Sequence, residues 1–122
     1  MKLRTAIVQI LLLCLPLTKV NAEKLTQGQF TSNIESYSSI LKDVNSKYAI
    51  AEKNGNLKDI VFQHCRRLGI YHEMLIMAQE NRQLSEATSL EIFMKDTLQE
   101  NLRPILGIGM TEEEFCIANK KR

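Results

Sequence analysis

The amino-acid sequence predicts an all-α protein, a small antiparallel bundle of three helices with a short C-terminal helix and one disulfide. Three observations support this prediction. Apolar residues between Phe30 and Ala51 recur at spacings of three and four, which places them along one side of a helix. Residues that favour helix ends divide the rest of the chain into segments of helical length. Two cysteines, Cys65 and Cys116, remain once an N-terminal leader is set aside.

Residues 1–22 have the layout of a cleaved secretory signal peptide. A short basic segment precedes an apolar run from Ala6 to Leu15, and Val20-Asn21-Ala22 carries small or apolar residues where a signal peptidase reads the chain. The run is about half as long as the roughly 20 apolar residues of a helical membrane span. We therefore expect residues 23–122 to form a single helical domain with no membrane span.

Removal of the leader changes the charge balance and the cysteine count. Three of the 16 basic residues leave and all 14 acidic residues stay, so the mature chain has a net charge of about −1. This balance offers no broad basic surface for nucleic acid. Cys14 leaves as well, and an even pair of cysteines in an exported chain predicts a disulfide between Cys65 and Cys116.

The first helix is expected to begin near Phe30, after a frayed polar lead-in, with Thr26 or Thr31 as its cap. It should end at Asn54-Gly55, because glycine readily takes the left-handed conformation that follows a helix. Its apolar side is formed by Phe30, Ile34, Tyr37, Leu41, Val44, Tyr48 and Ala51.

The second helix is expected to run from Leu57 to about Leu84, with Asn56 as its cap. Apolar residues occur on more than one of its sides, and such a helix is normally covered by several neighbours. We therefore predict that it is the centre of the bundle.

Two shorter signals define the remaining helices. Ser85 is expected to cap a third helix, which Pro104 should end or kink near Leu102. Thr111 and Glu114 have the spacing of a capping box, so a short last helix should follow.

The expected topology agrees with the cysteine pairing. Short turns make neighbouring helices antiparallel, so the last helix begins at the end of the bundle where the second helix starts. Cys65 lies about 12 Å along the second helix from that end. Cys116 on the last helix can therefore reach it.

The two histidines do not form a metal site. His64 and His72 stand eight residues apart, about 12 Å along a helix, whereas a zinc helix places histidines at i and i+4. We interpret them as residues at a boundary between helices, with pH sensing as the alternative. No metal and no cofactor are expected.

No arrangement of residues indicates an enzyme. The serines cluster on or near the polar side of the first helix, without the Gly-x-Ser-x-Gly pattern of a hydrolase. The thiol of Cys65 precedes two arginines, which would favour a reactive thiolate, but the expected disulfide uses that thiol. We therefore expect a protein without catalytic residues.

Apolar residues outside the main helical faces give the remaining functional signal. They predict either core filling, the commoner role of methionine, or a surface for a protein partner or for a second copy of the chain, a homodimer. The residues of this predicted surface are Phe62, Ile70, Met74, Met77, Ile105 and Ile108.

These observations together predict a non-catalytic exported binding protein. Its expected location is the periplasm, where it would serve an envelope or secretion assembly as an accessory, adaptor or chaperone-like factor. The alternative is a secreted helical effector or inhibitor that acts on a protein outside the producing cell.

Overall fold

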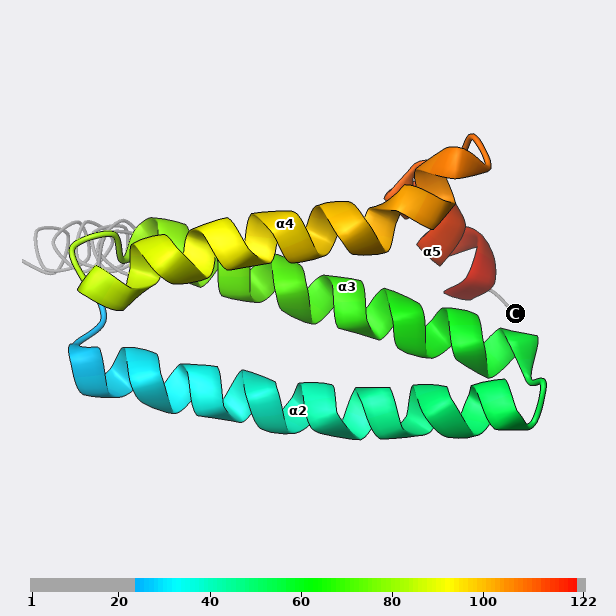
Figure 1. The fold of residues 1–122 in the computed structure, drawn as a ribbon, viewed down its shortest axis with the longest axis horizontal. Helices are drawn as coiled ribbons and strands as arrows, with labels where there is room; N and C mark the ends of the chain where they lie inside the picture. Colours follow the sequence, from blue (N-terminus) through cyan, green and yellow to red (C-terminus); the bar gives the residue numbers. More distant parts are fainter. Residues whose placement is uncertain (1–23, 121–122) are drawn as a thin grey trace, which may run out of the picture.

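A computed structural model of the chain describes residues 24–120; the predicted signal peptide, residues 1–22, lies outside them. The described residues form four helices and no strand. The helices are α2 (Gln27–Lys53), α3 (Leu57–Glu80), α4 (Ser85–Gly107) and α5 (Glu112–Lys120). Figure 1 shows α2, α3 and α4 as long antiparallel rods, with α5 at the end where α4 finishes. The predicted fold class is confirmed.

Helix α3 is the centre of the bundle, as its apolar residues on several sides predict. It packs against α2, α4 and α5, and α4 also packs against α5, whereas α2 and α4 come together at their first turns, where Phe30 and Ala87 share a buried cluster. Phe30 and Val44 of α2 and Leu68 of α3 are the largest fully buried side chains. The core is therefore built in two interfaces that share α3.

Two clusters of buried residues hold opposite halves of the bundle. Phe30, Met77 and Ala87 join the start of α2, the end of α3 and the start of α4. Leu68, Leu98 and Ile105 join α3 to the second half of α4, and α5 covers this cluster with Phe115 and Cys116. Each helix that packs on α3 is thereby fixed by buried apolar contacts.

Helix α2 begins at Gln27, three residues before the predicted start. Thr26 and Gln29 form a capping box: the Gln29 amide donates to Thr26 Oγ1 at 3.2 Å, and the Thr26 amide donates to Gln29 Oε1 at 2.9 Å. The other end is as predicted, with Gly55 at a φ of 65°.

Helix α3 ends at Glu80 rather than near Leu84, because Asn81 ends it with its side chain. Asn81 is 3% exposed. Its Nδ2 donates to the Met77 carbonyl at 2.8 Å, and its Oδ1 accepts from the Leu25 amide at 2.7 Å. The lead-in to α2 is therefore anchored across the bundle, and the predicted fraying is wrong for residues 24–26.

Replacement of Asn81 by alanine is expected to lower the free energy of unfolding by about 1–3 kcal/mol. The Leu25 amide would lose its partner in a partly buried site, and unmade hydrogen bonds of this kind cost about that much. Urea denaturation measures the change. The comparison is Gln83→Ala, which should cost less, because this exposed side chain makes only the longer bonds to the Leu25 carbonyl at 3.4 Å and to Asn81 Oδ1 at 3.5 Å. Equal effects of the two variants would contradict the anchoring role.

Helix α4 continues through Pro104 to Gly107, so of the two predicted outcomes, an end or a kink near Leu102, the end is wrong. Proline has no N–H to donate to the carbonyl of Glu100, four residues earlier. Burial compensates for this loss, since Ile105 is only 2% exposed and belongs to the cluster with Leu68. Figure 1 shows α4 changing direction near this end. Ser85 is the first residue of the helix rather than its cap.

Candidate functional site

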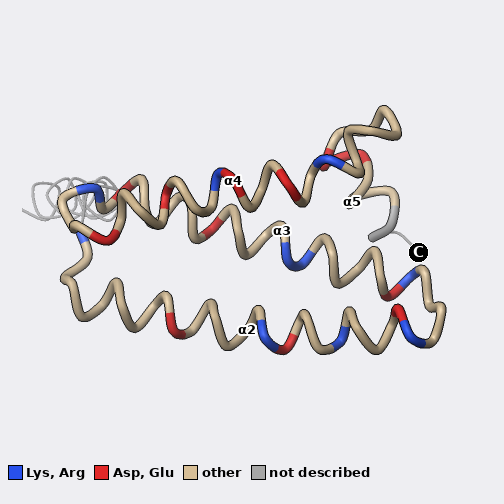
Figure 2. Tube along the Cα trace, viewed as in Figure 1, with Lys and Arg blue, Asp and Glu red and all other residues tan. Residues whose placement is uncertain are grey.

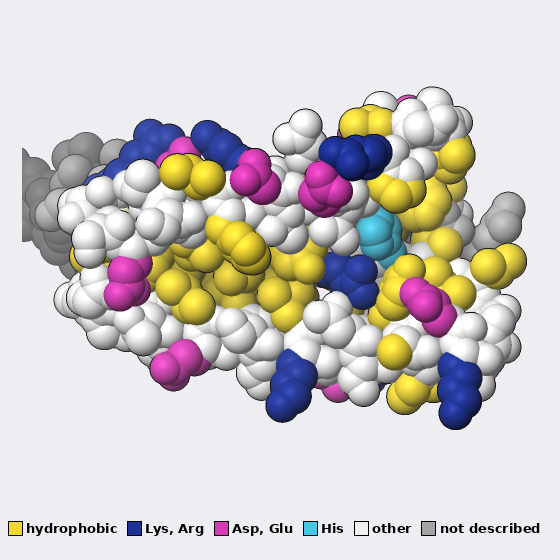
Figure 3. Space-filling view, viewed as in Figure 1, with side chains coloured by type: hydrophobic (Ala, Val, Ile, Leu, Met, Phe, Trp, Pro, Cys, Tyr) yellow, Lys and Arg dark blue, Asp and Glu magenta, His cyan; other side chains and the backbone are white. Residues whose placement is uncertain are grey.

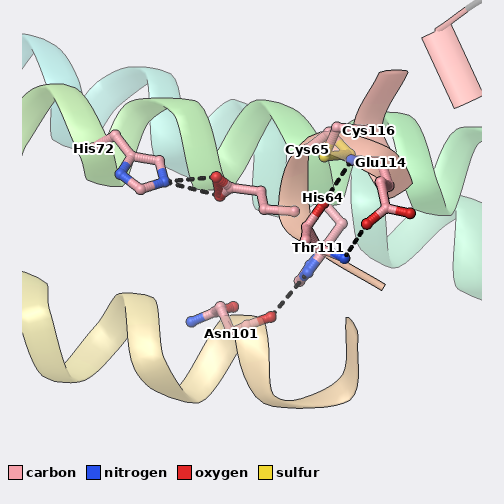
Figure 4. Close-up of a disulfide and its surroundings, with 8 residues drawn as sticks. His64, Cys65, His72, Asn101, Thr111, Glu114 and Cys116 are labelled. Carbon is pink, nitrogen blue, oxygen red and sulfur yellow. Dashed lines mark hydrogen bonds and ion pairs between the residues drawn. A yellow bond between two sulfur atoms is a disulfide. The ribbon is translucent and has the colours of Figure 1, made fainter. Parts of the chain in front are cut away.

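The Cys65–Cys116 disulfide joins α5 to the first half of α3, as predicted. The two Cα atoms lie 5.7 Å apart and the cysteines are 51 residues apart in sequence. The predicted capping box at the start of α5 is also present: the Glu114 amide donates to Thr111 Oγ1 at 3.1 Å, and the Thr111 amide donates to Glu114 Oε1 at 3.3 Å. Figure 4 shows both features beside His64.

Exposed apolar residues gather where α2 ends, α3 begins and α4 meets α5. We call this region the disulfide end. Ten large apolar side chains are exposed in residues 24–120, and six of them belong to the disulfide end. These six are Ile50, Leu57, Phe62, Leu106, Ile108 and Ile117. Figure 3 shows apolar side chains around this end and along the seam between α2 and α4. Apolar surface gathered in this way is typical of an interaction site.

A pocket of about 340 Å³ opens at the disulfide end. Residues of all four described helices, and Ile108 directly after α4, form its walls. The lining residues are Tyr48, Ile60, Val61, His64, Pro104, Ile105, Ile108 and Phe115. Apolar walls with few polar groups are the usual composition of a ligand or side-chain pocket.

Arg67 contacts Tyr48, one of the residues that line this pocket. Its guanidinium carbon is 4.4 Å from the centre of the Tyr48 ring, a cation–π contact between α3 and α2. Arg67 Nε is buried without a hydrogen-bond partner among the described residues. Burial, followed by the neighbouring Glu52 carboxylate, raises the pKa of Tyr48, while the Arg67 charge opposes this shift. The phenol is therefore neutral and the guanidinium is the charged group here.

His64 connects three helices beside the pocket, which confirms its predicted place at a helix boundary. Its Nε2 lies 3.1 Å from the Asn101 carbonyl of α4, a geometry in which Nε2–H donates. Its ring meets Phe115 of α5 edge-to-face, with centroids 6.5 Å apart. Burial lowers the pKa of His64, and the Arg67 charge acts in the same direction. The Asn101 carbonyl and Glu112 oppose the shift but do not cancel it.

The stability of the bundle is expected to fall as His64 becomes protonated. The unfolded chain binds this proton near pH 6.5, whereas the folded chain binds it at a lower pH. Stability that depends on neutral His64 is therefore present above about pH 6.5 and is lost as the pH falls through the folded pKa. Thermal melts at about pH 7.5 and about pH 5 should show a larger loss for the wild type than for His64→Gln. Equal losses would contradict this prediction.

His72 makes a separate contact with the start of α5. Its Nε2 lies 2.8 Å from both carboxylate oxygens of Glu112, and Figure 4 shows His72 apart from His64. Within residues 24–120, no group of three or more histidine, cysteine, aspartate or glutamate side chains could hold a metal ion. The two histidines thus attach α5 and α4 to α3 at different points.

The opposite end of the bundle is closed by polar interactions. Glu91 of α4 accepts from Arg82 Nε and from Lys95 Nζ, both at 2.9 Å. The hydrogen bonds from Arg82 and then from Lys95 hold the pKa of Glu91 at about 2. Lys24 donates to the Glu80 carbonyl at 2.7 Å across the same end. Six of the ten exposed large apolar side chains of residues 24–120 lie at the disulfide end, and the other four are Ile40, Ile76, Ile92 and Phe93.

The predicted partner surface is wrong at three of its six residues. Met74, Met77 and Ile105 are 4%, 7% and 2% exposed and belong to the core. Ile70 is partly buried. Phe62 and Ile108 are exposed and lie at the disulfide end.

The structure adds residues that sequence reasoning did not select. Ile50 and Leu57 flank the turn at Gly55, and both are exposed. Ile50 lies outside the apolar stripe of α2, and Leu57 is the first residue of α3. Their positions near helix ends were a signal in the sequence from which exposure could have been predicted. The lack of a hydrogen-bond partner for Arg67 Nε could not be predicted from the sequence, because it depends on which side chains, such as Tyr48, lie beside it in space.

Comparisons with family models, with curated proteins and with solved structures find no match to this chain. Among the described helices, none combines the length and the apolar character needed to cross a membrane. The geometry of the disulfide end therefore provides the basis for a functional proposal.

Proposed function

We propose that this chain is a non-catalytic, exported binding protein that docks a protein partner at the disulfide end. One observation carries the proposal: six of the ten exposed large apolar side chains of residues 24–120 gather at the end of the bundle where an apolar pocket also opens, whereas polar contacts close the other end. Large aromatic and aliphatic side chains that fill a partner's pocket supply most of the binding energy in such interfaces. Phe62 and Ile108 are exposed residues of the proposed surface, and they line two different pockets at this end.

The sequence supports an envelope location. The layout of residues 1–22 is that of a secretory signal, and disulfides such as Cys65–Cys116 persist in oxidising compartments. We therefore propose a periplasmic accessory, adaptor or chaperone-like factor for an envelope or secretion assembly. Cell fractionation tests the location, since recovery in the medium would favour the secreted effector instead.

Site-specific photo-cross-linking tests the docking surface. A benzophenone amino acid at position 62 should give a discrete adduct with an envelope protein in intact cells. Position 76 is the matched control, because Phe62 and Ile76 lie on α3 with exposed fractions of 52% and 51% but at different ends of it. An adduct of twice the chain's mass would identify a second copy as the partner. Equal adducts from both positions, or none from position 62, would overturn the proposal.

A further inference from the structure

Arg67, whose Nε has no hydrogen-bond partner among the described residues, contacts a side chain that lines the apolar pocket. Arg67 follows His64 by one helical turn and contacts the ring of Tyr48, and both of these neighbours line the pocket. In the described part of the chain, Arg67 makes no hydrogen bond or ion pair, and its Nε is buried. A buried donor without a partner is costly. A bound anion would remove that cost.

The pocket walls favour an alkyl chain over a peptide segment. They consist of aliphatic and aromatic side chains, with His64 already bonded to the Asn101 carbonyl. The backbone groups of the surrounding helices are used within the helices, and the Ile108 amide donates to the Ile105 carbonyl. A peptide inserted here would bring amide groups that find no partner. An alkyl chain brings no polar group that must be satisfied.

We propose that the pocket binds an aliphatic carboxylate of the fatty-acid type, with its chain among Val61, Ile105 and Ile108 and its carboxylate on Arg67. The planar guanidinium matches a carboxylate with two parallel hydrogen bonds, and this geometry is the one that arginine provides best. A volume of about 340 Å³ falls at the lower end of the range for small-molecule sites. Binding of this ligand does not require the protein partner proposed above.

Isothermal titration of the disulfide-bonded chain, residues 23–122, with decanoate and with decanol tests the site. Decanoate should bind saturably, and decanol should bind about tenfold or more weakly, because it cannot form the charge-assisted pair. Arg67→Gln should reduce decanoate affinity to the level of decanol. Arg66→Gln is the matched control: it removes the same charge one residue earlier, from a side chain whose contact is Gln63 at 3.3 Å.

A second pair of variants tests the chain-binding part of the pocket. Ile108→Asp should abolish decanoate binding, whereas Leu106→Asp should leave it unchanged, since both residues are exposed but only Ile108 lines the pocket. Circular dichroism verifies that each variant is folded. Equal affinity for decanoate and decanol, equal effects of the two arginine variants, or no saturable binding would overturn the proposal. An adduct from position 62 without decanoate binding would leave the protein-docking function standing and remove the fatty-acid site.

Discussion

Replacement of Cys65 by serine is expected to lower the free energy of unfolding by about 4 kcal/mol. The disulfide joins residues 51 apart in sequence, and the loop-entropy model assigns about this stabilisation to a loop of that length. The net stability of a small domain is only about 5–15 kcal/mol. The thermal midpoint should therefore fall by roughly 15–30 °C.

The partner cysteine provides the control for this result. Cys116→Ser should cause a similar loss, and the double variant should add little, because either change alone removes the same cross-link. Reduction of the wild type should reproduce the effect in thermal melts. Strongly additive losses would show that the two cysteines stabilise the fold independently.

Local sequence signals were sufficient for most of the fold. The spacing from Phe30 to Ala51 predicted the packed side of α2, and the turn at Gly55 and the capping box at Thr111 lie where they were expected. The larger errors concern the ends of α3 and α4, which depend on residues distant in sequence. Asn81 ends α3 because it bonds to Leu25, which is 56 positions away in sequence.

The end of α4 shows how tertiary packing overrides a local rule. Pro104 is a strong helix-ending signal, yet α4 continues past it to Gly107. Beyond the proline, Ile105 is buried against Leu68 and Leu98. The stabilisation from burying Ile105 could not be predicted from the residues around Pro104, because Leu68 lies on another helix. Proline therefore marked the place where α4 changes direction rather than the place where it stops.

The candidate surface was only partly predictable for a related reason. A helical wheel identifies apolar residues outside a main face but not which neighbours will cover them. Met74 and Met77 are covered because α3 has helices on several sides, so the alternative reading of the methionines as core filler is correct. Phe62 remains exposed because it lies near the start of α3, where the covering helices α2 and α4 approach their ends.

Replacement of Leu68 by alanine is expected to destabilise the bundle by about 2–5 kcal/mol. Leu68 is 1% exposed and packs with Leu98 and Ile105, so its truncation leaves a cavity between α3 and α4. Urea denaturation measures the loss. The matched control is Ile76→Ala on the same helix, which should change stability by less than about 1 kcal/mol because Ile76 is 51% exposed. Similar losses for both variants would contradict the observed packing.

A double-mutant cycle extends this prediction to the organisation of the core. Cys116 packs against the cluster of Leu68, whereas Phe30 belongs to the other cluster. Leu68→Ala and Cys116→Ser should therefore couple by about 0.5–3 kcal/mol, since release of α5 lets the cavity at Leu68 relax or fill with water. Phe30→Ala and Cys116→Ser should be additive, because the two sites share no partner. Equal coupling in the two cycles would show that the bundle has one continuous core and that α5 stabilises all of it.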